Sequence, residues 1–183
     1  MITVVEHMTL DGVMQAPAGA EEDTRDGFTR GGWSAPYQDE ALMRLVGPPT
    51  GAGGGLMLGR RTYEHFFSVW PKRTDGNPFT PILNAATKYV VSGTLREPLP
   101  WENSVLMREP AAPEMDVAVL GSGELVQSLL ARDLVDRFLL TIYPIVLGTG
   151  RRLFVDGGVP ASLRLVESEA TAKGVVYAQY VRA

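Results

Sequence analysis

Short apolar runs recur along the chain and predict β-strands. The first run, residues 2–8, is rich in Val, Ile and Thr, as buried strands are. Two runs near the C-terminus, 162–170 and 175–181, predict a hairpin. Pro144 lies inside a long run and predicts a bulge or an edge position, because proline cannot donate a ladder hydrogen bond. The remaining runs predict strands at 56–58, 88–92, 104–107, 116–120 and 135–147.

Between these strands, apolar residues recur at helical spacing. They predict helices at 37–46, 61–69, 79–86 and 124–132. Strands that alternate with helices and end in a hairpin predict an α/β fold whose mostly parallel sheet carries an antiparallel edge. A length of 183 residues suits one hydrophobic core, so we expect a single domain over residues 1–183.

The segment from Thr9 to Pro36 has neither the apolar runs of strands nor the apolar spacing of helices, and it is rich in Gly, Asp, Thr and Ala. A loop of this length inside a compact domain is uncommon and is often functional, for example as a lid over a site. Trp33 lies in this loop, and it is the tryptophan that we expect to line a substrate site.

The amino-acid composition and net charge exclude several kinds of site and partner. The chain has no cysteine, which excludes a disulfide scaffold and a thiolate nucleophile, and its two histidines, His7 and His65, lead us to expect no metal site. A net charge of −4 argues against broad nucleic-acid binding, which needs a dense basic face. No apolar run approaches the roughly 20 residues of a membrane-spanning helix, and no secretory signal is evident. We expect a cytoplasmic protein with a small-molecule substrate and no membrane partner.

Gly121-Ser122-Gly123 forms a turn between a predicted strand and a predicted helix. Two glycines let the backbone approach a ligand, and a helix N-terminus offers free N–H groups and a partial positive charge. That geometry suits a pyrophosphate. A tight turn with Ser122 as the helix N-cap explains the same residues equally well.

Gly59-Arg60-Arg61-Thr62 repeats this arrangement after the strand at 56–58. Two guanidinium groups and a hydroxyl can bind a phosphate ester, although an ordinary helix with solvated arginines is the alternative. Two such turns in one small domain suit a dinucleotide that carries an additional phosphate.

Three carboxylates are candidates for proton transfer or for orienting a substrate. Asp11 directly follows the first strand, where open α/β sheets bind ligands, but it also precedes Gly12 as an ordinary turn residue would. Asp39 and Glu40 lie on the first turn of the first predicted helix, where acidic residues are favoured by the helix dipole in any case.

Six segments carry a family resemblance through their order and spacing, and together they cover essentially the whole chain. They are Met8-Thr9-Leu10-Asp11-Gly12, Leu58-Gly59-Arg60-Arg61-Thr62-Tyr63-Glu64, Trp70-Pro71, Lys88-Tyr89-Val90-Val91-Ser92, Leu120-Gly121-Ser122-Gly123-Glu124-Leu125 and Pro144-Ile145-Val146-Leu147-Gly148-Thr149-Gly150-Arg151-Arg152-Leu153-Phe154. In these segments the chain resembles the dihydrofolate reductase-like superfamily, specifically the group related to the C-terminal reductase domain of riboflavin-biosynthesis deaminase-reductases.

The resemblance implies a central, mostly parallel sheet of about eight strands with flanking helices and a C-terminal antiparallel hairpin, and NADPH lying across the strand ends. It implies that Ser92 lies near the adenine half of this cofactor. The residues implied for the 2′-phosphate side are Gly59, Arg60, Arg61 and Thr62, and those implied for the pyrophosphate are Gly121, Ser122, Gly123, Glu124 and Leu125.

Our hypothesis is therefore an NADPH-dependent reductase of a pterin-, pyrimidine- or imine/carbonyl-type small molecule. This activity would be similar to dihydrofolate reductase and to the 5-amino-6-(5-phosphoribosylamino)uracil reductase of riboflavin biosynthesis. Asp11 is the first candidate for the catalytic acid, followed by Asp39 or Glu40. The alternatives are a non-catalytic NADP(H)-binding or sensor protein and a structural domain that binds nothing. The apolar run at 138–147 suggests a sheet edge that a second subunit covers, so we expect a homodimer.

Overall fold

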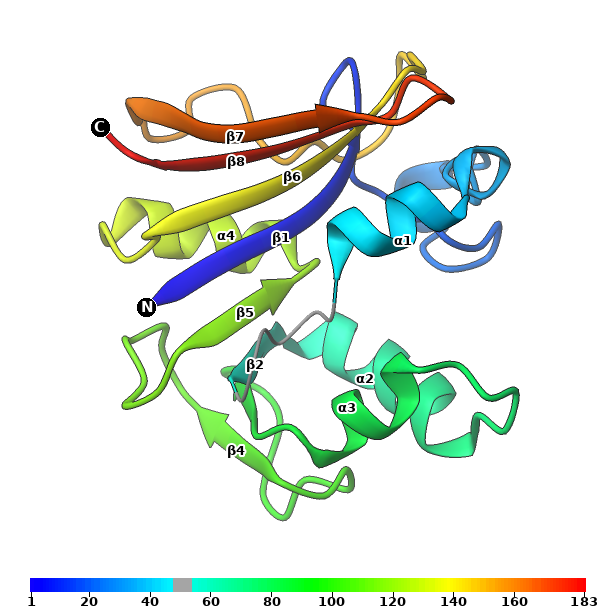
Figure 1. The fold of residues 1–183 in the computed structure, drawn as a ribbon. Helices are drawn as coiled ribbons and strands as arrows, with labels where there is room; N and C mark the ends of the chain where they lie inside the picture. Colours follow the sequence, from blue (N-terminus) through cyan, green and yellow to red (C-terminus); the bar gives the residue numbers. More distant parts are fainter. Residues whose placement is uncertain (48–53) are drawn as a thin grey trace. The chain divides into compact units, whose positions relative to one another are not determined.

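A computed structural model describes residues 1–47 and 54–183. Its strands are β1 (Ile2–Thr9), β2 (Gly55–Gly59), β3 (Lys88–Val91), β4 (Ser104–Met107), β5 (Val117–Leu120), β6 (Arg137–Tyr143), β7 (Leu163–Ala170) and β8 (Val176–Arg182). They form one eight-stranded sheet in the order β4-β3-β2-β5-β1-β6-β8-β7 (Figure 1). The predicted α/β class, with a mostly parallel sheet and a C-terminal antiparallel pair, is confirmed.

The helices follow the sequence predictions closely. They are α1 (Glu40–Val46), α2 (Arg60–Val69), α3 (Phe79–Ala85) and α4 (Gly123–Ala131), with 3-10 turns at Arg25–Gly27, Ala35–Tyr37 and Trp70–Lys72. The first helix begins three residues later than expected, because Asp39 caps it: its carboxylate accepts a hydrogen bond from the Leu42 amide at 2.8 Å. In the described parts of the chain, no helix has both the length and the apolar character that crossing a bilayer requires.

The chain divides into two compact units, which we describe separately. The first comprises Met1–Val4 and Pro48–Asp136, and the second comprises Val5–Gly47 and Arg137–Ala183. The expectation of a single domain over residues 1–183 stays a prediction.

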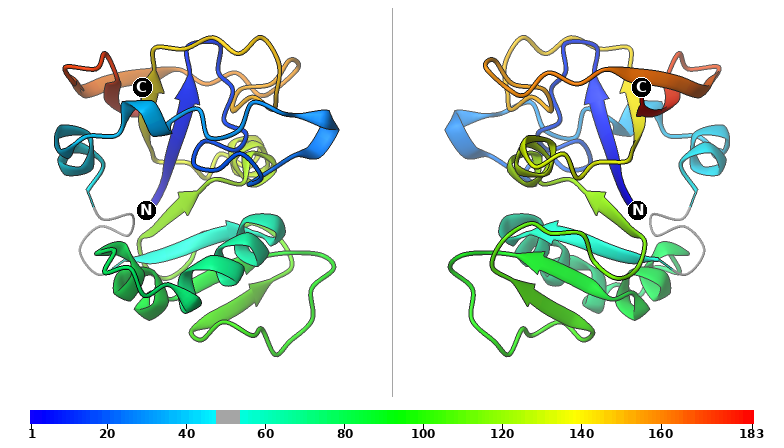
Figure 2. Two further views of the ribbon diagram at one scale, coloured as in Figure 1. Left: turned by 90° about the vertical axis from the view of Figure 1, so that its right-hand side faces the viewer. Right: turned by 90° about the vertical axis from the view of Figure 1, so that its left-hand side faces the viewer.

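In the first unit, β4, β3, β2 and β5 form a parallel ladder. Gly59 lies opposite Val91 and Met57 lies opposite Val119, so the carboxyl ends of β2, β3 and β5 share one edge of the sheet. Helices α2 and α3 lie together on one face of this ladder (Figure 2). The register therefore brings the predicted strand-end turns of this unit side by side.

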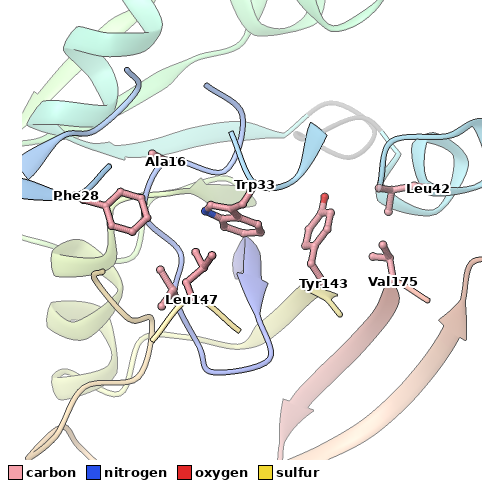
Figure 3. Packing of buried hydrophobic residues seen from close by; sticks show 8 residues of the cluster. Ala16, Phe28, Trp33, Leu42, Tyr143, Leu147 and Val175 are labelled. Carbon is pink, nitrogen blue, oxygen red and sulfur yellow. The ribbon is translucent and has the colours of Figure 1, made fainter. Parts of the chain in front are cut away.

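In the second unit, β6, β8 and β7 form an antiparallel ladder. Its core is a cluster of buried side chains from the long N-terminal loop, α1, the end of β6 and the final hairpin turn (Figure 3). The members of this cluster are Val13, Ala16, Phe28, Trp33, Leu42, Tyr143, Leu147 and Val175. Side chains of the long N-terminal loop are thus part of this core.

Two expectations about the long apolar run are wrong. The strand does not extend from residue 135 to residue 147: β6 ends at Tyr143, because Pro144 has no N–H to continue the ladder. The strand is also not at an edge, since β6 lies between β1 and β8. The two edge strands of the sheet are β4 and β7, so the reason given for a homodimer falls away and the homodimer itself stays a prediction.

Candidate functional site

The two predicted strand-end turns of the first unit are joined by one hydroxyl group. We call them the paired turns: residues 59–62 after β2 and residues 121–123 after β5. The Ser122 Oγ accepts a hydrogen bond from the Gly59 amide at 2.9 Å and donates one to Thr62 Oγ1 at 2.6 Å. Residues about 60 positions apart in the sequence therefore form one local structure.

The backbone of the paired turns needs its glycines. A Cβ added at Gly59 would lie 3.0 Å from Ser122 Oγ and 3.2 Å from Ser122 Cβ, so a larger residue there would push the two turns apart by a few tenths of an ångström. Gly121 has a φ of +60° and Ser122 has a φ of 66°, which places both in the left-handed region.

Neither helix N-terminus at the paired turns is capped by the side chain of its own N-cap residue. Gly59, which has no side chain, is the N-cap residue of α2, and Ser122, the N-cap residue of α4, makes no side-chain hydrogen bond to that helix. The prediction that Ser122 occupies the N-cap position is correct, but its hydroxyl faces the other turn instead of capping its own helix. Uncapped N–H groups and the positive ends of two helix dipoles suit anionic groups such as phosphates.

The arginine pair adds positive charge at the start of α2. Arg60 Nη1 lies 3.0 Å from Glu64 Oε2, and Arg61 Nη1 lies 3.6 Å from Glu124 Oε1. All four side chains are exposed, and exposed ion pairs of this kind contribute only about 0–1 kcal/mol. A phosphate group can therefore compete with these carboxylates for both guanidinium groups. With its uncapped helix ends and glycine backbone, the site fits a dinucleotide phosphate.

Ser92 follows β3 at the same edge of the sheet. It is buried, and its Oγ accepts hydrogen bonds from the amides of Thr94 at 3.2 Å and Leu95 at 3.0 Å. The structure therefore brings the predicted cofactor residues of three neighbouring strands to one edge of the first unit, with Ser92 shaping the turn after β3.

Asp11, in the second unit, is held by four hydrogen bonds and a nearby guanidinium. Its carboxylate accepts bonds from Thr9 Oγ1 at 2.6 Å and from the amides of Gly148 at 2.8 Å and Leu147 at 3.2 Å, and Arg152 Nη2 lies 3.7 Å away. Its main-chain oxygen accepts a bond from Arg152 Nε at 2.8 Å. Burial raises the pKa of Asp11, but these hydrogen bonds outweigh it and lower the pKa to about 2. The group is an anion at neutral pH, which argues against proton donation and for an anchoring role.

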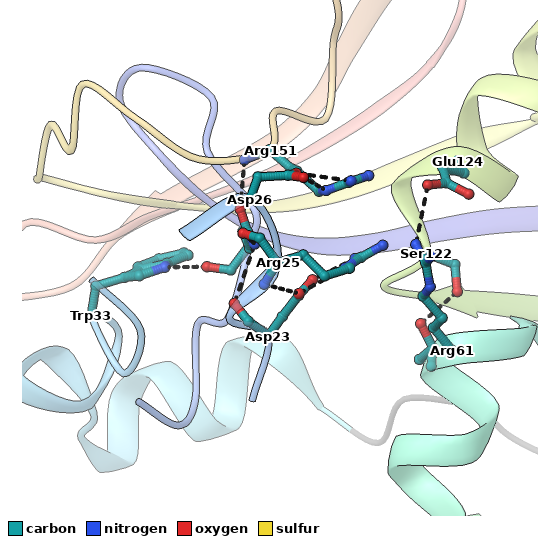
Figure 4. Close-up of polar contacts among 10 residues, drawn as sticks. Asp23, Arg25, Asp26, Trp33, Arg61, Ser122, Glu124 and Arg151 are labelled. Atoms are coloured by element: carbon teal, nitrogen blue, oxygen red, sulfur yellow. Dashed lines mark hydrogen bonds and ion pairs between the residues drawn. The ribbon is translucent and has the colours of Figure 1, made fainter. Parts of the chain in front are cut away.

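The loop that Asp11 begins is bonded to the segment after β6. Val13 pairs with Arg152, and the Gln15 side chain donates to the main-chain oxygens of Asp23 and Arg25 while accepting from the Arg151 amide. Further along the loop, Asp23 binds Arg25, and Asp26 binds Arg151 at 2.9 Å (Figure 4). These contacts fix the start and the middle of the loop, and a lid function for it stays a prediction.

The structure places Asp39, Glu40 and Trp33 at a helix cap, on a helix surface and in the core, respectively. Asp39 caps α1, and Glu40 is exposed on the first turn of that helix. Trp33 is 5% exposed, and its Nε1 donates to the Gln15 main-chain oxygen at 2.8 Å, so its ring belongs to the core cluster. Their catalytic and substrate-binding roles stay predictions.

Strand β1 carries two titratable side chains on opposite faces. Glu6 points to the buried face of β1 with Ile2 and Val4, and only 4% of it is exposed. Among the described residues, its Oε1 has no hydrogen-bond partner. Burial raises the pKa of Glu6 to about 8, and the nearby charge of Glu22 adds to this effect. On the other face, His7 Nδ1 lies 3.0 Å from the Tyr143 hydroxyl oxygen.

Part of the chain matches a known protein family, and the fold matches solved structures. Residues 105–177 match the RibD C-terminal domain family. A putative riboflavin biosynthesis protein from Shewanella sp. PV-4 superposes with a TM-score of 0.68 at 21% identity, covering 100% of this chain and 98% of that protein. The chain is related to the RibD C-terminal domain group. This confirms the resemblance that the six sequence segments indicated.

A second solved structure and two curated proteins are also similar to this chain. A pyrimidine reductase-like protein from Corynebacterium diphtheriae superposes with a TM-score of 0.62 at 13% identity, covering 100% of this chain and 91% of that one. The uncharacterized protein YyaP of Bacillus subtilis (strain 168) is 27% identical over 135 residues, which cover 68% of this chain and 72% of YyaP. The uncharacterized protein YwjB of the same organism is 28% identical over 139 residues, which cover 70% of this chain and 73% of YwjB. The chain has a reductase-like fold.

Sequence reasoning missed Glu6 and the His7–Tyr143 pair. The signal for Glu6 was the period of two along β1, which puts a carboxylate in line with Ile2 and Val4. For His7 no local signal exists, because Tyr143 lies 136 positions away and only the sheet brings the two together.

Proposed function

We propose that this protein is an NADPH-dependent reductase that transfers hydride to a pterin-, pyrimidine- or imine/carbonyl-type small molecule. The observation that carries the proposal is the Ser122 hydroxyl, which joins two glycine turns beside an arginine pair and two uncapped helix ends. The reductase-like fold and the relation to the RibD C-terminal domain support the same conclusion.

In this proposal the paired turns hold the dinucleotide. Amides at the start of α2 and α4 bind phosphate oxygens, and Arg60 and Arg61 bind the 2′-phosphate by leaving their exposed carboxylate partners. Ser122 keeps the two turns in register, and Ser92 shapes the adenine side. When bound, NADPH supplies the hydride, while the protein supplies orientation and a protected site.

A non-catalytic NADP(H)-binding or sensor protein is the second candidate. It is favoured by the engagement of two predicted acids, since Asp11 is an ionised anchor and Asp39 caps α1. Turnover separates the two functions: a reductase oxidises NADPH when a dihydropterin, an aminouracil or a cyclic imine is present, and a sensor binds NADPH without consuming it.

The cofactor claim is tested by fluorescence titration with NADPH and NADH. We expect tighter binding of NADPH by about tenfold or more, because the 2′-phosphate gains charge-assisted hydrogen bonds. The double variant Arg60→Ala with Arg61→Ala should lose this preference. Arg164→Ala, an exposed arginine on β7, is the matched control and should retain it. Equal affinity for the two dinucleotides in the wild type would sink the proposal.

A further inference from the structure

Strand β7 is an open edge of the sheet and belongs to the second unit. It is eight residues long and lies beside β8, whereas the other edge strand, β4, has four residues. In the described parts of the chain, the main chain of β7 has no recorded hydrogen bond to any element except β8. A long strand with free N–H and C=O groups along one side is a template for pairing with another strand.

Two neighbouring apolar side chains lie at the centre of this edge. Leu165 is 49% exposed and Val166 is 48% exposed. A second strand paired with β7 would remove part of this apolar area from water, which favours association. Because exposed apolar residues are common on protein surfaces, these two alone do not say which partner fits.

The charges on either side of the apolar pair point to a second copy of this chain. Residues 164–167 read Arg-Leu-Val-Glu, with a positive charge at one end and a negative charge at the other. When two such segments meet antiparallel about their centre, each Arg164 lies opposite the partner's Glu167. Opposite charges that face each other across antiparallel strands attract, and like charges repel. The segment is therefore complementary to itself.

A β-bulge makes this pairing possible. Side chains of directly opposed residues must share a face of the sheet, but residues three apart on a regular strand point to opposite faces. In β7 the ladder shifts, so that Arg164 lies opposite Val181 and Glu167 lies opposite Gln179. Since Gln179 and Val181 are two apart on β8, Arg164 and Glu167 point to the same face. Within the described residues, neither charge is in a recorded ion pair that would compete.

We propose that two copies of this chain form a two-fold symmetric dimer by antiparallel pairing of their β7 strands. Two ion pairs between Arg164 and the partner's Glu167 flank a centre made by Leu165 and Val166 of both copies. A two-fold pairing uses β7 of both copies and closes the assembly, whereas pairing of β7 with β4 would continue into a filament. The dimer surface is thus β7 and not the segment 138–147, and it does not depend on the proposed reductase function.

Sedimentation equilibrium of the whole chain tests this interface. We expect the wild type to be a dimer at micromolar concentration. Arg164→Glu should raise the dissociation constant of the dimer by about 10²-fold, because it sets two carboxylates opposite each other at both ends of the apolar centre. Glu167→Arg should have the same effect by opposing two guanidinium groups. Glu169→Arg, an exposed position of β7 outside the four-residue segment, is the matched control and should leave the dimer intact.

A mixture of the two weakened variants gives the sharper result. One variant carries carboxylates at positions 164 and 167 and the other carries guanidinium groups at both, so in a mixed pair every charge meets its opposite. We expect an equimolar mixture to form a heterodimer, which also shows that neither variant is misfolded. A monomeric wild type would overturn the inference and leave β7 open to a different partner. An Arg164→Glu variant as dimeric as the wild type, or a mixture that stays monomeric, would overturn it as well.

Discussion

The Asp11 carboxylate is stabilised as an anion by donors on both sides of its loop. Thr9 donates from the same turn, and the Leu147 and Gly148 amides donate from the segment after β6. Because these bonds are stronger with the ionised carboxylate than with the neutral acid, they lower its pKa and link loop geometry to pH.

Asp11→Asn should therefore lower the free energy of unfolding by about 1–2 kcal/mol at pH 7. The lowered pKa contributes stability that is present above about pH 4 and is lost as pH falls towards 2. The difference between variant and wild type should shrink over that window in urea unfolding. Asp156→Asn, an exposed carboxylate in a later loop, is the control. Equal stability of Asp11→Asn and wild type at pH 7 would contradict the anchoring role.

Glu6 shows the opposite behaviour, since burial favours its neutral form. A pKa raised from 4.5 to about 8 contributes stability that is fully present below pH 4.5 and is lost as pH rises to 8. We expect Glu6→Gln to abolish this loss, which amounts to about 3–5 kcal/mol in the wild type. Urea unfolding at pH 5 and pH 8, with Glu169→Gln as an exposed control, measures it. A wild-type stability with the same pH profile as Glu6→Gln would refute the buried neutral carboxyl.

At the scale of elements, the strand–turn–helix units could be predicted because each combines an apolar run with a glycine turn. The position of the turn residues after β2 and β5 follows from this local pattern. The bond from Ser122 to Thr62 could not be predicted, because it depends on the parallel register of strands far apart in the sequence. The end of β6 was missed because apolar residues continue past Pro144 and conceal the break.

Ser122→Ala tests whether the paired turns act as one element. The variant removes an acceptor for the Gly59 amide and a donor to Thr62, so it should lower the free energy of unfolding by about 1–2 kcal/mol. It should also weaken NADPH binding several-fold, since the turns lose their fixed spacing. Ser128→Ala in the same helix is the control, measured by urea unfolding and NADPH titration. Unchanged stability and affinity in Ser122→Ala would show that the two turns are independent.

At the scale of the whole molecule, the fold class and the related group were accessible from sequence, but the order of the strands was not. An apolar run shows where a strand lies in the sequence but not which strands pair with it. The place of β5 between β2 and β1 is therefore known only from the structure. Because the sequence does not give strand neighbours, β6 was wrongly expected at an edge of the sheet. With β4 and β7 as the edges, Leu165 and Val166 on β7 are half exposed, and a homodimer remains a prediction for solution measurements.

Hydrogen–deuterium exchange with and without NADPH tests the central claim most directly. We expect NADPH to slow exchange at residues 60–62 and 121–125, because bound phosphates would accept hydrogen bonds from amides at the start of α2 and α4. NADH, which lacks the 2′-phosphate, should protect residues 121–125 but not Arg60 and Arg61. Protection by NADPH elsewhere in the chain, with unchanged exchange at the paired turns, would contradict the account.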